Sequence, residues 1–230
     1  MSAQNAILVA LALPLAGALA IALAGRVSAN LRETVTLVTA GGLAYTVWQI
    51  VPEIMAGGRP GVTLAEVLPG ISLAFTVEPL GMLFAALASS LWIINSIYSI
   101  GYMRGNAEKN QTRFYVMFAV SLAATMGIAF AGNLFTLFLC YEALTLATYP
   151  LVAHKGDEKT VRSARVYLGI LLATSIGLFL PAIIWTYAVA GTGDFTLGGI
   201  LAGNLEGPAV GLLLALFVFG IGKAAVMPVH

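Results

Sequence analysis

The sequence predicts an all-α polytopic membrane protein, and three observations carry this prediction. The 230-residue chain is 60% hydrophobic and only 9% charged, whereas a soluble domain has about 25% charged residues. The apolar runs are continuous and about 20 residues long, which is the length that crosses a bilayer as a helix. They lack the two-residue alternation of an outer-membrane barrel. The net charge of +1 gives no sign of a nucleic-acid partner.

About seven apolar segments are predicted as spans. They cover residues 6–25, 34–51, 79–102, 114–131, 134–152, 166–189 and a last segment from about residue 209 to Lys223. The first span lacks the basic residues that open a secretory signal peptide, so it is predicted to be retained. Residues 52–78 are rich in Gly and Pro and are predicted not to span, and apolar alternation from Ile71 to Val77 predicts a short extended stretch there. Pro181 predicts a kink in the sixth span.

Basic residues lie almost entirely on one side of this predicted topology. Nine follow the first, third and fifth spans, and only Arg59 lies on the other side. The nine are Arg26, Arg32, Arg104, Lys109, Arg113, Lys155, Lys159, Arg162 and Arg165. Since an excess of Lys and Arg marks the cytoplasmic face, we expect these three loops in the cytoplasm and the N-terminus outside. The expected location is a bacterial-type inner (plasma) membrane.

Glu142 is a carboxylate near the middle of the fifth predicted span. Burying such a charge in hydrocarbon costs at least a few kcal/mol, and an intramembrane ionisable residue is by default a candidate functional group. Tyr141 and Thr145 lie beside it in sequence and offer supporting polar groups. The sequence therefore predicts a proton or cation relay at Glu142. The alternative is a protonated Glu142 that joins two helices through a hydrogen bond.

Lys223 is the other charge inside a predicted span. Gly220 and Gly222 precede it and Pro228 follows. Gly and Pro around a buried charge are typical of a broken helix whose freed backbone groups line a polar cavity. A lysine there can gain and lose a proton as a partner carboxylate approaches or leaves. The alternative is a lysine at a helix end that extends to the membrane surface.

Two segments resemble a known family. The stretch NLFTLFLCYEALTLATYPLV, residues 133–152, resembles the fifth span of the proton-antiporter-like membrane subunits. These subunits are shared by Mrp-type multisubunit Na⁺/H⁺ antiporters, the membrane arm of respiratory complex I and membrane-bound hydrogenases. The stretch GIGKAAVMPVH, residues 220–230, resembles the broken seventh span of the same family, and YSIGYM at residues 98–103 is also similar. The resemblance covers residues 78–230.

The resemblance implies both a fold and a set of site residues. Glu142 is the essential glutamate that pairs with Lys223, the proton-loading lysine, and His230 is a weaker candidate as the histidine of the broken helix's second half. Family members have about fourteen spans with two inverted repeats. Residues 1–112 are then the first three helices with an outer-face loop, and residues 113–230 begin the first repeat with helices four to seven. We expect an N-terminal piece of a subunit roughly twice as long, with a split gene as the alternative.

The implied function is that of an ion-translocating component of a multisubunit Na⁺/H⁺ antiporter, similar to the D-type Mrp proteins, with protons moving through Glu142 and Lys223. The resemblance implies other membrane subunits as partners, in a lipid bilayer, with protons and Na⁺ as the ions. No cofactor or metal is predicted, because no nucleotide-binding loop or metal-ligand spacing occurs. One alternative is a proton-pumping subunit of complex I or a membrane-bound hydrogenase. Another is a structural membrane subunit without transport, in which Glu142 and Lys223 lie in dry helix contacts.

Overall fold

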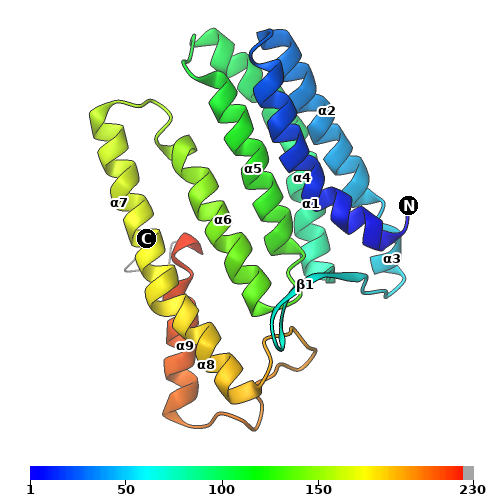
Figure 1. The fold of residues 1–230 in the computed structure, drawn as a ribbon, viewed down its shortest axis with the longest axis vertical. Coiled ribbons are helices and arrows are strands. Elements are labelled where there is room, and N and C mark those ends of the chain that lie inside the picture. The colour runs from blue at the N-terminus through cyan, green and yellow to red at the C-terminus, as the bar shows by residue number, and fades with distance from the viewer. Residues whose placement is uncertain (225–230) are drawn as a thin grey trace.

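The computed structural model describes residues 1–224, and these form a bundle of long helices (Figure 1). Six helical segments of the described part are long and apolar enough to cross a membrane, which confirms the predicted polytopic all-α fold. The long helices are α1 (Ala3–Ala24), α2 (Ala29–Trp48), α4 (Pro79–Gly105), α5 (Gln111–Ala129), α6 (Leu134–Val152) and α7 (Glu158–Thr174), which continues through η1 (Ser175–Phe179) into α8 (Leu180–Ala190). Two helices are shorter, α3 (Val51–Met55) and α9 (Pro208–Gly220).

Polar side chains set where three of the long helices begin. The Ser2 hydroxyl accepts the Asn5 N–H at the start of α1, and the Ser28 hydroxyl accepts the Leu31 N–H at the start of α2. The Asn133 side chain accepts the Thr136 N–H at 2.8 Å at the start of α6. Such caps satisfy N–H groups that have no partner within the helix. Because of its cap, α2 begins five residues before the predicted span, at Ala29 rather than Thr34.

A β-hairpin links α3 to α4 and packs on the start of α6. Strand β1 (Gly61–Leu68) pairs antiparallel with β2 (Ile71–Thr76), so the predicted extended stretch is the second strand. Asn133 donates its amide to the Ser72 carbonyl at 2.8 Å, and the Thr136 hydroxyl accepts the Ala74 N–H at 3.0 Å. These bonds fix the hairpin against the N-terminal end of α6, at one end of the bundle (Figure 1).

Helix α6 lies between two groups of helices (Figure 1). On one side α1, α2, α4 and α5 form the main core, whose fully buried residues include Ile7, Ala10, Leu43, Ala85 and Met126. On the other side lie α7, α8 and α9. Gly127 lets α5 approach α6 closely, because a Cβ at this position would lie 2.5 Å from the Cys140 sulfur. The close approach holds α6 firmly in the bundle and leaves its other face to the last three helices.

The sixth predicted span contains a π-helical turn, η1, which ends two positions before Pro181. Proline has no N–H and its ring clashes with the carbonyl four residues earlier, so it distorts the helical turn that precedes it. A π turn lengthens the hydrogen-bond spacing locally and re-aims the side chains it carries. The predicted distortion at Pro181 therefore takes the form of this turn, and it places Phe179 against α6 and α9.

Candidate functional site

The helix break predicted near Lys223 is present, and it falls before the lysine. Helix α9 ends at Gly220, and Ile221, with φ −85° and ψ 64°, leaves the helical conformation. Gly222–Ala224 then form a single 3₁₀ turn, η2, which contains Lys223. Lys223 therefore lies just past the end of α9, where backbone groups lack helical partners. Pro228 and His230 lie outside the described residues.

Lys223 contacts Tyr141 of α6 in three ways. Its Nζ donates to the Tyr141 carbonyl at 2.6 Å, and the same Nζ lies 3.8 Å from the centroid of the Tyr141 ring. Its backbone N–H donates to the Tyr141 hydroxyl at 3.1 Å. Tyr141 is buried and Lys223 is half-buried. The described part of the chain thus holds the lysine on α6 through one tyrosine.

Glu142 is the next residue along α6, so it shares a peptide bond with the group that binds the ammonium. Its Oε1 atom is buried and has no hydrogen-bond partner among the described residues. The ion pairs found within residues 1–224 do not include Glu142 with Lys223. The structure therefore places Lys223 against the residue that precedes Glu142, and no ion pair joins Glu142 to Lys223 within the described part of the chain. The Thr145 hydroxyl donates to the Tyr141 carbonyl at 3.0 Å, so this carbonyl accepts both the Thr145 hydroxyl and the Lys223 ammonium.

Aromatic rings surround the Tyr141 side of the site. Phe179 of η1 lies 5.7 Å from the Tyr141 ring in an edge-on arrangement, 5.9 Å from Phe138 and 5.9 Å from Phe217. Edge-to-face packing at these separations is favourable and specific in geometry. Phe179 therefore joins α6 to α9 and fixes the ring on which Lys223 rests.

Gly220 permits the contact between α9 and η1. A Cβ there would lie 2.5 Å from the Phe179 nitrogen and 2.7 Å from its Cα, so the obstacle is backbone. We expect Gly220→Ala to push α9 away from η1 and to lower the free energy of unfolding by about 1–3 kcal/mol, as overpacking does. Gly211→Ala, on the same helix with open space around it, is the control and should not destabilise the protein. Unfolding in detergent measures both, and equal stabilities would refute the close approach.

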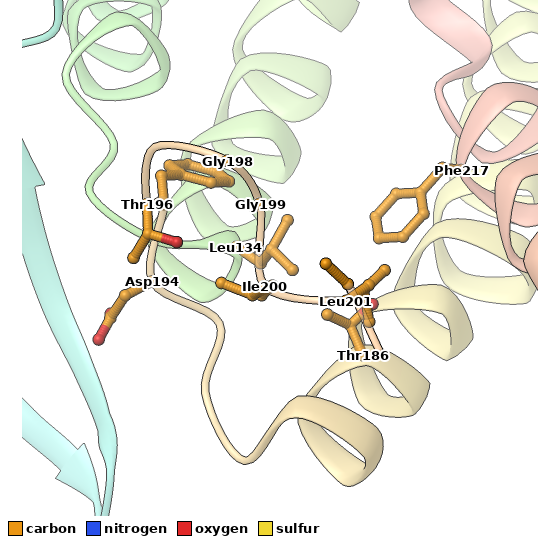
Figure 2. Close-up of a pocket in the computed structure, with 11 residues that line it drawn as sticks. Leu134, Thr186, Asp194, Thr196, Gly198, Gly199, Ile200, Leu201 and Phe217 are labelled. Carbon is orange, nitrogen blue, oxygen red and sulfur yellow. The ribbon is translucent and has the colours of Figure 1, made fainter. Parts of the chain in front are cut away.

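A pocket of about 370 Å³ lies beside this cluster, between the start of α6, α8, α9 and the loop after α8. Figure 2 shows Leu134, Ile200, Leu201 and Phe217 around it, with Asp194 turned away. The Asp194 carboxylate instead accepts the Thr192 hydroxyl at 3.1 Å. The lining is mainly apolar, which does not suit an ion. Phe217 contributes both to this pocket and to the cluster that packs on Tyr141.

A second buried charged cluster is not predicted from the sequence. Glu33 accepts Arg32 Nη2 at 2.9 Å and Arg104 Nη2 at 2.5 Å, and both Arg32 and Glu33 are buried. Arg32 also donates to Gln111 at 2.8 Å and lies 5.2 Å from the Tyr115 ring. The cluster joins α2, α4 and α5.

This cluster corrects two sequence expectations. Arg32 and Arg104 are expected as loop charges, but they lie in the first turn of α2 and the last turn of α4. The expectation that spans contain no charges other than Glu142 and Lys223 is wrong for the same reason, because α2 begins early enough to include Arg32 and Glu33. The signal that could have revealed this is Ser28, an N-cap residue placed just before them.

Comparison with known proteins relates the chain to a family of membrane proteins. The family described as "NADH:quinone oxidoreductase/Mrp antiporter, TM" matches residues 131–230. NADH-quinone oxidoreductase subunit N of Desulforudis audaxviator (strain MP104C) is 27% identical over 165 residues, which cover 70% of this chain and 32% of that protein. The D component of the Na(+)/H(+) antiporter of Alkalihalophilus pseudofirmus (strain ATCC BAA-2126 / JCM 17055 / OF4) is 26% identical over 175 residues, 74% of this chain and 35% of that protein.

Solved structures share the fold. A chain of the Mrp complex from Dietzia sp. DQ12-45-1b has a TM-score of 0.80 and 25% identity, with 100% of this chain and 42% of that chain covered. A chain of the archaeal membrane-bound sulfane sulfur reductase has a TM-score of 0.83 at 19% identity, with 99% and 46% covered, which shows the fold alone. The chain spans about a third of the length of the two curated relatives. Residues 131–230 therefore match the transmembrane family that NADH:quinone oxidoreductases and Mrp antiporters share, and the chain is similar to antiporter-like membrane subunits.

Proposed function

We propose that this chain moves protons through Glu142 and Lys223 as a subunit of a multisubunit Na⁺/H⁺ antiporter. The observation that carries the proposal is the position of Lys223, which lies at a helix break and donates its ammonium to the carbonyl of Tyr141. The next residue is Glu142, whose buried Oε1 atom has no hydrogen-bond partner among the described residues. An acid and a base at neighbouring positions inside a membrane, next to freed backbone groups, are suited to handling a proton.

The proposed cycle uses the separation of these two groups. An ionised Glu142 beside Lys223 stabilises the ammonium form, since opposite charges favour each other strongly where little water is present. Moving the ammonium away from the carboxylate removes that stabilisation and favours release of the proton. Tyr141 and Thr145 supply the neighbouring polar groups. Other membrane subunits would drive the separation, a proposal supported by the multisubunit Mrp complex among the structural neighbours.

A second candidate is a proton-pumping subunit of a redox-driven complex, in which the same residues would serve a quinone reductase or a hydrogenase. The similarity to NADH-quinone oxidoreductase subunit N favours this candidate. A chain of respiratory complex I from Thermus thermophilus also shares the fold, with a TM-score of 0.68 at 20% identity. The two candidates differ in what drives the proton, and they make the same use of Glu142 and Lys223.

The orientation belongs to the same proposal. We propose that the loops after the first, third and fifth spans face the cytoplasm of a bacterial-type cell. Exposed basic residues of the α6–α7 connection and of the first turns of α7 support this, because an excess of Lys and Arg marks the cytoplasmic side. They are Lys155, Lys159, Arg162 and Arg165.

Everted membrane vesicles that hold the chain in its complex test the proposal. Respiration acidifies the vesicle interior, and adding Na⁺ is expected to collapse that ΔpH in vesicles with the chain and not in vesicles from a strain lacking it. K⁺ in place of Na⁺ is the ion control. If the ΔpH does not respond to either cation but builds up with a redox substrate only when the chain is present, the antiporter proposal is wrong and the redox pump is supported.

A further inference from the structure

The break after α9 leaves the backbone N–H of Lys223 without a helical acceptor. In a continuous α-helix this group would donate to the carbonyl of Phe219, but Ile221 has left the helical conformation. Unsatisfied backbone groups are costly inside a membrane. The Tyr141 hydroxyl, from a residue 82 positions away, accepts this N–H at 3.1 Å. Tyr141 thus caps the break from another helix.

The ammonium of Lys223 is held by the same residue. It donates to the Tyr141 carbonyl at 2.6 Å and lies 3.8 Å from the ring centroid, well inside the range of a cation–π contact. The buried Oε1 of Glu142 is meanwhile without a partner in the described part of the chain. Glu142 follows Tyr141 directly on α6, and in this structure the ammonium occupies Tyr141.

Tyr141 is itself fixed in place. Its side chain is buried, and Phe179 of the π turn packs edge-on against its ring at 5.7 Å. Its carbonyl also accepts the Thr145 hydroxyl at 3.0 Å. Because both the ring and the backbone carbonyl of Tyr141 are engaged, Tyr141 can set the position of Lys223, whose side chain has the greater rotational freedom.

We propose that Tyr141 is the positioning residue of the relay. It caps the break of α9 and docks the Lys223 ammonium apart from Glu142, so that each proton transfer requires the ammonium to move from Tyr141 to the carboxylate. This inference rests on the proposed function of Glu142 and Lys223. It gives Tyr141 a separate role, because Glu142 and Lys223 could form an acid–base pair without it.

Hydrogen–deuterium exchange of the full complex measures the cap directly. Tyr141→Phe keeps the ring and the backbone carbonyl and removes only the hydroxyl that accepts the Lys223 N–H. We expect peptides covering residues 221–224 to exchange roughly two- to ten-fold faster in this variant, which is the effect of losing one net hydrogen bond. Tyr187→Phe on α8 is the matched control, because Tyr187 is half-buried and makes none of the Lys223 contacts. Unchanged exchange in Tyr141→Phe would overturn the inference.

Transport in the same variants measures the positioning. We expect the rate of proton-coupled transport to be highest in the wild type, lower in Tyr141→Phe and lowest in Tyr141→Leu, which also loses the ring beneath the ammonium. Tyr187→Phe should match the wild type. Faster exchange with wild-type transport in Tyr141→Phe would also overturn the inference. If the proposed relay through Glu142 is wrong, the result differs: Glu142→Gln would transport normally, while hydrogen exchange at residues 221–224 would still be faster in Tyr141→Phe.

Discussion

Replacing Glu142 with glutamine is expected to lower proton-coupled transport by at least about 100-fold, the usual scale for loss of a positioned acid–base group. Glutamine has nearly the same shape and can still accept a hydrogen bond, but it cannot ionise. Lys223 would keep its contacts with Tyr141 and lose the carboxylate that stabilises its charged form after it moves. Cation-induced collapse of the ΔpH in vesicles that contain the assembled complex measures the rate.

Glu66→Gln is the matched control for this change. Glu66 lies on the exposed hairpin strand β1, where its Oε1 accepts the Gly70 N–H at 3.1 Å, and a glutamine oxygen can do the same. The control variant should transport like wild type. Equal transport by Glu142→Gln, at equal amounts of assembled complex, would remove Glu142 from the relay. It would then favour the structural alternative, in which this residue only joins helices.

The segments that the sequence predicts best have their ends marked by local signals. The fifth span is predicted at residues 134–152 and α6 has those bounds. Asn133, a strong N-cap residue, directly precedes it, and a polar loop follows. The hairpin strand is visible through its two-residue alternation, which a helix would not show.

The start of α2 cannot be obtained from hydropathy alone. Hydropathy alone places the start of the second span after the charged pair Arg32–Glu33, at Thr34, and leaves Arg32 in the preceding loop. In the structure Glu33 lies between two guanidinium groups, and the mutual neutralisation lets the charges enter the helix. Arg104 is 71 positions away from Glu33, and no local pattern reports such a distant partner.

The contact between Lys223 and Tyr141 lies beyond sequence reasoning for a related reason. Gly and Pro around Lys223 indicate a break, but not on which side of the lysine it falls. Because α9 ends at Gly220, the backbone N–H of Lys223 has no acceptor within the helix, and the Lys223 side chain lies beyond the end of α9. Which group of α6 then receives the ammonium depends on the packing of Phe179 and Gly220, and so on the tertiary structure.

The second large effect concerns stability and is expected for Glu33→Ala. The change would leave the buried Arg32 without its carboxylate, and the Nε atom of Arg32 already has no partner within residues 1–224. Removing one partner of a buried ion pair typically costs about 3–5 kcal/mol, because the remaining charge stays uncompensated. We therefore expect the free energy of unfolding in detergent to fall by about that amount and the contacts among α2, α4 and α5 to loosen.

Glu78→Ala provides the comparison that separates burial from charge pairing. Glu78 also pairs with an arginine, Arg59, at 2.7 Å, but the two side chains are 45% and 37% exposed, against 8% for Glu33. An exposed pair contributes about 0–1 kcal/mol, since water competes for both partners. Glu78→Ala should therefore unfold nearly like wild type, while Glu33→Gln, which keeps an acceptor for the guanidinium groups, should fall between the two alanine variants. Similar losses in Glu33→Ala and Glu78→Ala would mean that water reaches Arg32 in the membrane-embedded protein, and that the cluster anchors α2 no more strongly than a surface ion pair.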